Sequence, residues 1–380
     1  MRGSRLAGLA LGACAAACAT LAADGRGDVD LPDAHDGPFR VLKRTESCTG
    51  DVCTGVDELP PGTPDGLAKY PGVPASRAPA VLVRGSGEGN DLRTIVYAAR
   101  DLDAPPARIV RLEAADSRDF KDVAEVLTGD APFEAGAIGD PSALDVGGEV
   151  WLYYSIHPRK DAPAQLAGIA RARSTDGASG RSFVKDDAPL FTADGVKGSW
   201  ETEPPRAPSV LRLPDGTFRM FYASGVAIGE ASSADGVHFT RLDADPSTPE
   251  LDPVVVPSAP VDASALPPGV KPPFDDLAVD DPSVARVVSE VGRVLYRLHY
   301  TGRDRRTGSA IGLAGRFGDR GSFSRSPGPV YGGRSNPHVN APTVARFPAF
   351  SLIYCDVDFE SGQALGVGVA PASVKLRIVE

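Results

Sequence analysis

The sequence predicts an all-β fold, a five-bladed β-propeller whose blades are four-stranded antiparallel sheets. Two observations carry this prediction. A short motif, proline followed by a small residue and then usually an apolar one, recurs five times at intervals of roughly 60 to 75 residues. Each copy is followed by strand-length apolar runs separated by turn residues, in the same order. The periods are longer than those of WD40 or kelch repeats, but five units of four antiparallel strands indicate a propeller of five blades.

The proline motif predicts the first strand of each blade, because proline is tolerated at the first residue of a strand. The five copies are Pro79-Ala80-Val81, Pro141-Ser142-Ala143, Pro208-Ser209-Val210, Pro282-Ser283-Val284 and Pro342-Thr343-Val344. A two-sheet sandwich pair is the competing all-β fold, but it does not explain five copies in one strand order.

Three further strands follow each motif. The second strand is rich in aromatic and β-branched residues, a composition that favours strands; the five runs are 94–97, 150–154, 218–222, 294–300 and 350–354. The third strand is rich in small residues, which let neighbouring sheets approach closely; its runs are 108–114, 167–172, 227–232, 310–314 and 365–369. The fourth is expected to begin near Phe120, Phe183, Phe239 or Phe323, and to span Val374–Val379 in the last blade.

The N-terminal region is expected to lie outside the propeller, as a signal over 1–23 and a low-order leader over 24–76, with the blades over 77–380. Basic residues precede an apolar run that is too short to cross a bilayer as a helix. The run ends in Leu11-Gly12-Ala13-Cys14, which resembles the lipobox of bacterial lipoproteins and implies lipidation at Cys14. An ordinary secretory signal cleaved near Ala23 is the alternative, and both predict export.

Cysteine usage agrees with export. Cys48 and Cys53 flank a short polar loop and favour a local disulfide. A metal pair is the alternative, although no second pair completes a zinc site. Cys355 lies in an apolar strand pattern and is expected to be a buried thiol, whereas Cys18 has no assigned role.

The charge balance limits the partners. The formal net charge is -10, which argues against a nucleic-acid ligand and leaves a glycan or other small polar ligand. The propeller is expected to be monomeric and to meet a membrane only through the lipid anchor. The five histidines form no convincing metal set, so no metal or cofactor is expected.

Residues just before the five prolines are expected to converge at one mouth of the axis, because the first strand of each blade lines the channel. A concave, polar, convergent site is the default binding site. The predicted group comprises Arg77, Asp140, Arg206, Asp280, Asp281 and Asn340, with Trp200, Glu201, Glu203 and His338 close by.

The Asp-Pro-Ser openings, the strand Leu152 to Ser155 and the run Ser232 to Phe239 resemble the five-bladed propeller glycosidases of the arabinanase and β-xylosidase type and of the related invertase and levansucrase type. The resemblance covers about residues 78–380. It implies a carboxylate base or nucleophile on the first blade, a modulating Asp on the second and a Glu acid on the third.

Only the second-blade Asp matches in place, as Asp140. Arg77 and Ala78 stand at the first-blade position, and Arg206 stands at the third. A glycosidase therefore requires relocated carboxylates, and Asp140, Glu203 and Asp281 are the predicted catalytic residues. The alternative is a non-catalytic glycan- or protein-binding lipoprotein on the same fold. Paired arginines suit an anionic sugar in either case.

Overall fold

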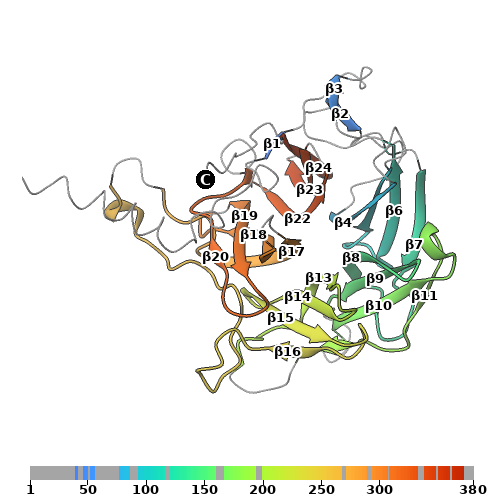
Figure 1. Ribbon diagram of the computed structural model, residues 1–380, viewed down its shortest axis with the longest axis horizontal. Coiled ribbons are helices and arrows are strands. Elements are labelled where there is room, and N and C mark those ends of the chain that lie inside the picture. The colour runs from blue at the N-terminus through green and yellow to red at the C-terminus, as the bar shows by residue number, and fades with distance from the viewer. Residues whose placement is uncertain are drawn as a thin grey trace, which may run out of the picture.

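The structure is a computed structural model, and it describes residues 39–41, 46–49, 52–55, 77–85, 93–115, 120, 122–159, 167–193, 199–267, 271–288, 292–306, 308–332, 338–347, 350–359 and 362–371. Antiparallel sheets fan around a central axis in these residues (Figure 1). The predicted all-β propeller is therefore confirmed. The signal segment with Cys14 and Cys18 lies outside the described residues.

Four sheets are built from consecutive stretches of chain. The first contains β4 (Arg77–Arg84), β5 (Arg93–Arg100), β6 (Arg108–Ala114) and β7 (Asp122–Thr128). The second contains β8 (Ile138–Val146), β9 (Glu149–Ile156), β10 (Gly168–Ser174), β11 (Phe183–Lys185) and β12 (Phe191–Thr192). The third contains β13 (Arg206–Arg212), β14 (Phe218–Ser224), β15 (Ala227–Ser233) and β16 (Thr240–Leu242). The fourth contains β17 (Ala278–Val288), β18 (Val294–Arg303), β19 (Ser309–Phe317), β20 (Ser324–Arg325) and β21 (Tyr331–Gly332).

The two ends of the chain complete a further sheet. Its strands are β22 (Val339–Arg346), β23 (Phe350–Phe359) and β24 (Gly362–Pro371), and β1 (Arg40–Val41) pairs with the outer edge of β24. The predicted outer strand Val374–Val379 lies outside the described residues. A separate hairpin of β2 (Glu46–Thr49) and β3 (Val52–Gly55) places Cys48 opposite Cys53 in its register.

The first strand of each sheet lies nearest the axis (Figure 1). The prolines, however, do not begin these strands, so that prediction is wrong. Each strand begins two to four residues earlier, and its pairing with the second strand slips at the residues flanking the proline. The proline sits at a β-bulge, where its missing N–H leaves no ladder bond unmade.

The residue before each proline adopts a left-handed backbone conformation. The φ values are 48° at Ala78, 43° at Asp140, 49° at Ala207, 47° at Asp281 and 49° at Ala341. This conformation costs a non-glycine residue about 1 to 2 kcal/mol. Its occurrence in all five sheets means that the surrounding packing imposes one shape on every inner strand.

Hydroxyl side chains tie the bulges at Ala207 and Ala341 to the preceding sheet, whereas the Asp281 N–H donates to Asp280 Oδ1 of its own strand at 2.9 Å. The N–H of Ala207 donates to Ser155 Oγ at 2.7 Å, and the N–H of Ala341 donates to Thr301 Oγ1 at 2.8 Å. Deeper along the strands, Val210 N donates to Ser142 Oγ and Val284 N to Ser209 Oγ, each at 3.0 Å. Since inner strands of adjacent sheets do not pair directly, these bonds satisfy backbone groups that the ladders leave open.

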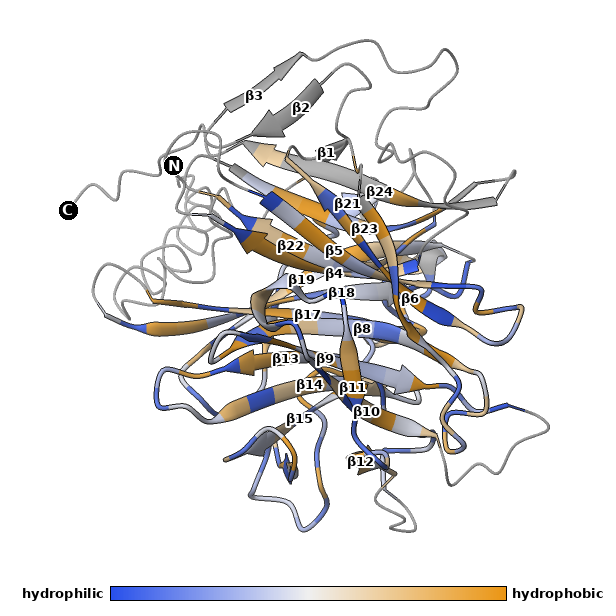
Figure 2. Ribbon diagram, turned by 90° about the vertical axis from the view of Figure 1, so that its right-hand side faces the viewer, coloured by the Kyte–Doolittle hydropathy of each residue, from blue (hydrophilic) through white to orange (hydrophobic). Residues whose placement is uncertain are grey.

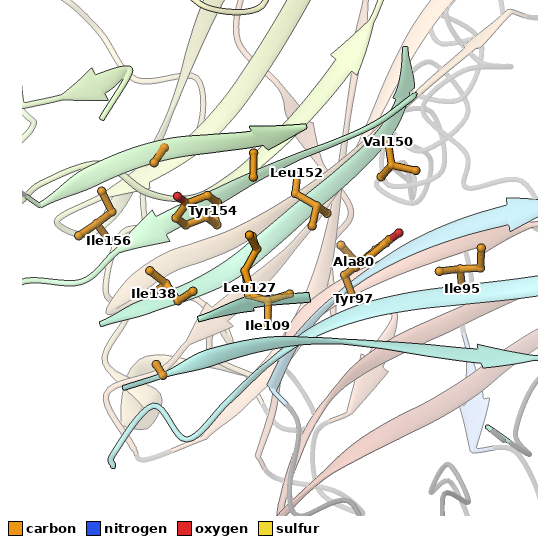
Figure 3. Close-up of a cluster of buried hydrophobic side chains, with 13 residues drawn as sticks. Ala80, Ile95, Tyr97, Ile109, Leu127, Ile138, Val150, Leu152, Tyr154 and Ile156 are labelled. Atoms are coloured by element: carbon orange, nitrogen blue, oxygen red, sulfur yellow. The ribbon is translucent and has the colours of Figure 1, made fainter. Parts of the chain in front are cut away.

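Buried apolar side chains form clusters between neighbouring sheets, and Figure 2 shows hydrophobic residues along the strands of these sheets. One such cluster joins the sheet of β4–β7 to that of β8–β12 and includes Tyr97, Ile109, Leu152 and Tyr154 (Figure 3). The small residues of the third strands give the second-strand aromatics room. A Cβ at Gly312, for example, would lie 2.4 Å from the Tyr300 ring.

The long segment between β16 and β17 packs on the propeller rather than only rimming it. Its Val254 and Val255 are buried, and Ile228 of β15 pairs with Val255 in an isolated bridge. Helical residues within the described ranges are the single turns Gly177–Ser179 and Ala263–Ala265, and neither has the length or apolar character to cross a membrane.

The buried contacts of Phe39 indicate that the N-terminal segment contributes to the stability of the folded protein. Phe39 is buried, its N–H donates to Val330 O at 2.7 Å, and its ring meets Tyr331 and His299 edge-on. We expect Phe39→Ala to lower the free energy of unfolding by about 3 to 5 kcal/mol, as for other buried Phe truncations, measured by denaturant titration. Val288→Ala, at a side chain that is 55% exposed, is the control and should change it by less than about 0.5 kcal/mol. Equal stability of the Phe39 variant would show that β1 does not hold the last sheet.

Candidate functional site

The five bulges meet at one mouth of the axis. A cavity of about 30 Å³ is lined by all five prolines and the residues before them, which are Ala78, Asp140, Ala207, Asp281 and Ala341. This volume has room for about one or two waters, since one water needs roughly 10 to 15 Å³. The predicted convergence of the inner strands at a shared opening is therefore present, although the axial opening itself is narrow.

Asp140 contacts a histidine that was not among the predicted site residues. His157, one residue beyond β9, lies with Nε2 3.1 Å from Asp140 Oδ2. The two atoms are not aligned as a hydrogen bond, since Nε2 is buried without a well-aligned acceptor. The contact is thus mainly electrostatic. Gly139 makes it possible, because a Cβ at that position would lie 2.7 Å from the same nitrogen.

Asp140 and His157 each favour the charged form of the other. Burial alone would raise the pKa of Asp140, but His157, helped by Ser155 and Arg206, outweighs burial and holds that pKa below its usual value. Burial likewise disfavours the imidazolium of His157, but the Asp140 carboxylate outweighs it and raises the His157 pKa. Asp140 is consequently ionised around neutral pH.

Arg206 joins the third sheet to the fourth. Its Nη2 donates to Asp280 Oδ2 at 2.7 Å and to Gly225 O at 3.3 Å, and its Nη1 donates to Glu203 Oε2 at 3.3 Å. Asp280 is nearly buried, and its other oxygen accepts the Asp281 N–H at 2.9 Å. Arg206 therefore fixes the carboxylate that lies beside the fourth bulge.

Asp281 has the opposite protonation preference from Asp140. Burial, with the negative charges of Asp280 and Asp140, raises its pKa to about 7. Its Oδ2 accepts from Thr301 Oγ1 at 2.9 Å and from Ala341 N at 3.3 Å, and the Arg303 guanidinium lies 4.0 Å away. Asp281 is thus poised to hold a proton at neutral pH next to an ionised carboxylate.

Asp356 is a fourth carboxyl group at this mouth and was also missed. It lies on β23 at the register position of Ser155 and Thr301, and Oδ1 accepts the Ala78 N–H at 2.7 Å. Burial, with the charges of Asp281 and Asp140, raises its pKa well above the usual value. Asp356 belongs to no recognisable motif, because it is a single aspartate in a strand with apolar neighbours. Aligning the second strands with one another would have predicted its place, since it stands at the position of Ser155 and Thr301.

The remaining predicted rim residues lie at the edges of this group. Arg77 donates to the exposed Asp103 at 3.0 Å, and Glu203 is 60% exposed beside Arg206. Asn340 has a buried Oδ1 without a hydrogen-bond donor among the described residues. His338 is exposed and forms an isolated bridge with Ser309.

Glu201 and Trp200 instead belong to the packing between sheets. Tyr222 and the Arg241 Nε donate to Glu201 Oε1 at 2.5 and 2.7 Å, and Arg241 Nη2 donates to Oε2 at 2.8 Å. Trp200 stacks on Tyr222 with ring centroids 5.9 Å apart. The contacts of both residues are thus internal to the packing between sheets, and their substrate-binding role stays a prediction.

The same buried arrangement recurs in two other sheets, which identifies it as architectural. An acidic residue accepts from a second-strand tyrosine and pairs with a base from an outer strand. The sets are Glu134 with Tyr154 and Lys185, Glu201 with Tyr222 and Arg241, and Asp275 with Tyr300 and Arg325. Breaking such a pair leaves a buried charge, which is costly.

Among the residues that the structure describes, no group of three or more His, Cys, Asp or Glu side chains is arranged to hold a metal ion. The mouth brings together four carboxyl groups: the pKa of Asp140 is lowered, and those of Asp281 and Asp356 are raised. Arg206 and Arg303 lie beside them as cations, and His157 lies beside Asp140.

Solved structures of other proteins share this architecture. The chain is similar to a glycoside hydrolase at 15% identity and a TM-score of 0.58, over 81% of this chain and 90% of that one. It is also similar to a glycosyl hydrolase from Bacteroides ovatus, with 15% sequence identity and a TM-score of 0.55, over 89% of this chain and 95% of that one. A thermostable family-43 glycoside hydrolase is similar with 16% sequence identity and a TM-score of 0.53, over 80% of this chain and 91% of that one. No protein-family model and no curated protein matches the sequence. The fold is accordingly the propeller found in glycoside hydrolases.

The raised pKa of Asp281 predicts a pH-dependent stability effect. In the unfolded chain Asp281 ionises near its ordinary value of 3.8, whereas the folded protein keeps the proton to about 7. The unfolded state therefore binds fewer protons between these values, and stability falls as the pH rises through them. We expect Asp281→Asn to have little effect on Tm near pH 4 and to raise it by a few degrees at pH 8.

The control is Asp187→Asn, at an exposed aspartate, which should leave the difference between the two pH values unchanged. A Tm that falls equally at pH 4 and pH 8 in the Asp281 variant would mean that Asp281 serves as an ordinary ionised acceptor.

Proposed function

We propose that this chain is a carbohydrate-active propeller of five blades, which binds a glycan at the bulged mouth of its axis and hydrolyses it. The fold is shared with glycoside hydrolases. The observation that carries the proposal is the opposite protonation of two carboxyl groups at this mouth, since glycoside hydrolysis needs one protonated and one ionised carboxyl group. The five sheets support a closed ring, because each sends its first strand to the same cavity.

In this proposal Asp281 is the acid and Asp140 is the ionised partner. Asp281 gives its proton to the glycosidic oxygen as the bond to the anomeric carbon breaks. Asp140 stabilises the positive charge that develops on the sugar ring, and it takes the proton of the water that adds to the anomeric carbon. His157 and Arg206 keep Asp140 ionised until that step.

The arginines near this mouth favour an anionic sugar. Arg303 is 43% exposed and lies 4.0 Å from Asp281, a distance that leaves its N–H donors able to bind a carboxylate. Arg77 pairs with the exposed Asp103. A planar guanidinium matches a carboxylate through two parallel hydrogen bonds. We therefore propose a glycan that contains acidic sugars.

A non-catalytic glycan-binding propeller is the second candidate. Two observations favour it: Arg77 and Arg206 stand where carboxylates are expected, and the axial cavity at this mouth measures only about 30 Å³. Binding in this case would occur on the rim, without turnover.

Release of reducing sugar from acidic glycans tests the first candidate. We expect Asp140→Asn and Asp281→Asn each to reduce the rate by roughly 100-fold or more, the usual scale for general acid–base catalysis. The rate should fall as the pH rises above about 7, because Asp281 then loses its proton. Asp145→Asn, at the opposite end of β8, is the matched control and should retain activity. Binding on a glycan array without release by the wild type would select the second candidate.

We further propose that the protein is exported and anchored through lipidated Cys14, with a Cys48–Cys53 disulfide in the leader. The register of β2 and β3 supports the disulfide, because directly opposed residues in an antiparallel hairpin have Cα atoms about 4.5 to 5.5 Å apart, within the range that a disulfide spans.

The anchor predicts a change of fractionation. Cys14→Ser should move the expressed protein from the detergent phase to the aqueous phase in Triton X-114 partition, with Cys18→Ser as the control that leaves it in the detergent phase. A wild-type protein found in the aqueous phase would instead favour cleavage near Ala23 and secretion.

A further inference from the structure

The channel widens on the far side of the proline ring. A second cavity of about 330 Å³ begins at the five prolines and runs along the inner strands as far as Asp145 of β8 and Arg212 of β13. Its volume falls within the range of small-molecule sites, which is roughly 300 to 1,000 Å³. Ser142, Ser209 and Ser283 are among the residues that line it. The cavity is thus polar and roomy, and it is separate from the mouth that holds Asp281.

Arginines gather where the inner strands end. Arg212, Arg286 and Arg346 occupy the same position, four residues after the proline of their strands, and Arg84 lies five residues after Pro79. The equivalent residue of β8 is Asp145, whose Oδ1 pairs with Arg84 Nη2 at 2.6 Å. Asp145 therefore neutralises Arg84, which is one of the four arginines at this end of the inner strands.

The side chains of two of these arginines have no ion-pair partner among the residues that the structure describes. The side chain of neither Arg212, which is exposed, nor Arg286, which is half-buried, makes a hydrogen bond or ion pair with any part of the chain that the structure describes. They lie on adjacent inner strands, β13 and β17, which are linked by the bond from the Val284 N–H to the side chain of Ser209. Arg212 lines the cavity, and Arg286 stands at the equivalent position of the next strand, outside the lining. In a chain of formal net charge -10, two unpaired cations at this end of the inner strands form a local site for negative charge.

We propose that this end of the channel, defined by Arg84, Arg212, Arg286 and Arg346, binds a small dianion such as a phosphate-type or dicarboxylate ligand. Arg212 and Arg286 supply the two positive charges, and the serine hydroxyls in the cavity supply hydrogen bonds to the anion. The inference is independent of the glycan site, since none of these residues lies at the other mouth.

Calorimetric titration of the full chain at low ionic strength with inorganic pyrophosphate, and separately with succinate, tests the proposal. We expect the wild type to bind at least one of the two, and the choice between them separates a phosphate source from a carboxylate source. Affinity should fall as salt is added, because the interaction is between charges. Failure of both anions to bind would overturn the proposal.

Variants then locate the binding. Arg212→Gln and Arg286→Gln should each weaken it by roughly tenfold, the scale of one lost charge-assisted contact. Arg173→Gln, at an exposed arginine of β10, is the control and should leave affinity unchanged. Weaker binding in Arg173→Gln with unchanged binding in Arg212→Gln would contradict the assignment.

A measurement on the unmodified protein avoids any dependence on folding of the variants. Phenylglyoxal modifies accessible arginines, and mass spectrometry reports the rate at each. Pyrophosphate or succinate, whichever binds, should slow modification of Arg212 and Arg286 several-fold and leave Arg173 unaffected. Equal rates with and without the anion would show that it binds elsewhere.

Discussion

The bulge before each inner-strand proline is the constraint on which the rest of the structure depends. Proline removes a ladder donor, and the preceding residue turns into the left-handed region. At Ala207, Ala341 and Ala78 the N–H of that residue donates to a side chain of another sheet, which is Ser155, Thr301 and Asp356 respectively. The Asp281 N–H donates instead to Asp280 of its own strand. Sheet-to-sheet attachment and the shape of the axial mouth thus follow from one repeated backbone feature.

The neighbours of each bulge explain why the pKa values of two aspartates at the same mouth are shifted in opposite directions. Asp140 and Asp281 occupy equivalent backbone positions, so their pKa values differ only through their neighbours. Asp140 faces the His157 imidazolium, with Arg206 further off, whereas Asp281 faces Asp280 and has only a distant Arg303. A symmetrical scaffold thereby holds two carboxyl groups in opposite protonation states, which is the requirement of acid–base chemistry on a glycan.

Much of the fold is predictable from the sequence because it repeats. The proline motif and the aromatic second strands recur with fixed order, and Phe183 and Phe239 mark where the fourth strands start. The position of the prolines within their strands could not be predicted, because a bulge depends on pairing with a neighbour and not on local composition. Closure of the last sheet by Arg40–Val41 is a contact between distant segments and leaves no local pattern.

The candidate site is predictable in part. Arg206, Asp140, Asp280 and Asp281 come together because they lie beside the motif that repeats. His157 and Asp356 reach the same mouth from second strands, where nothing in the residue type marks them. Glu201 was assigned from its closeness in sequence to Arg206, but its carboxylate turns toward Tyr222 and Arg241, whose positions depend on packing between sheets.

The most direct test of this account is a carbon-detected NMR titration of the aspartate carboxyl groups, with Asp140 and Asp281 assigned through their Asn variants. The account predicts that Asp281 titrates near pH 7 and Asp140 below its usual range, with the two midpoints well separated. Two midpoints that coincide near 3.8 would contradict it, because the bulged mouth would then hold two ordinary surface carboxylates.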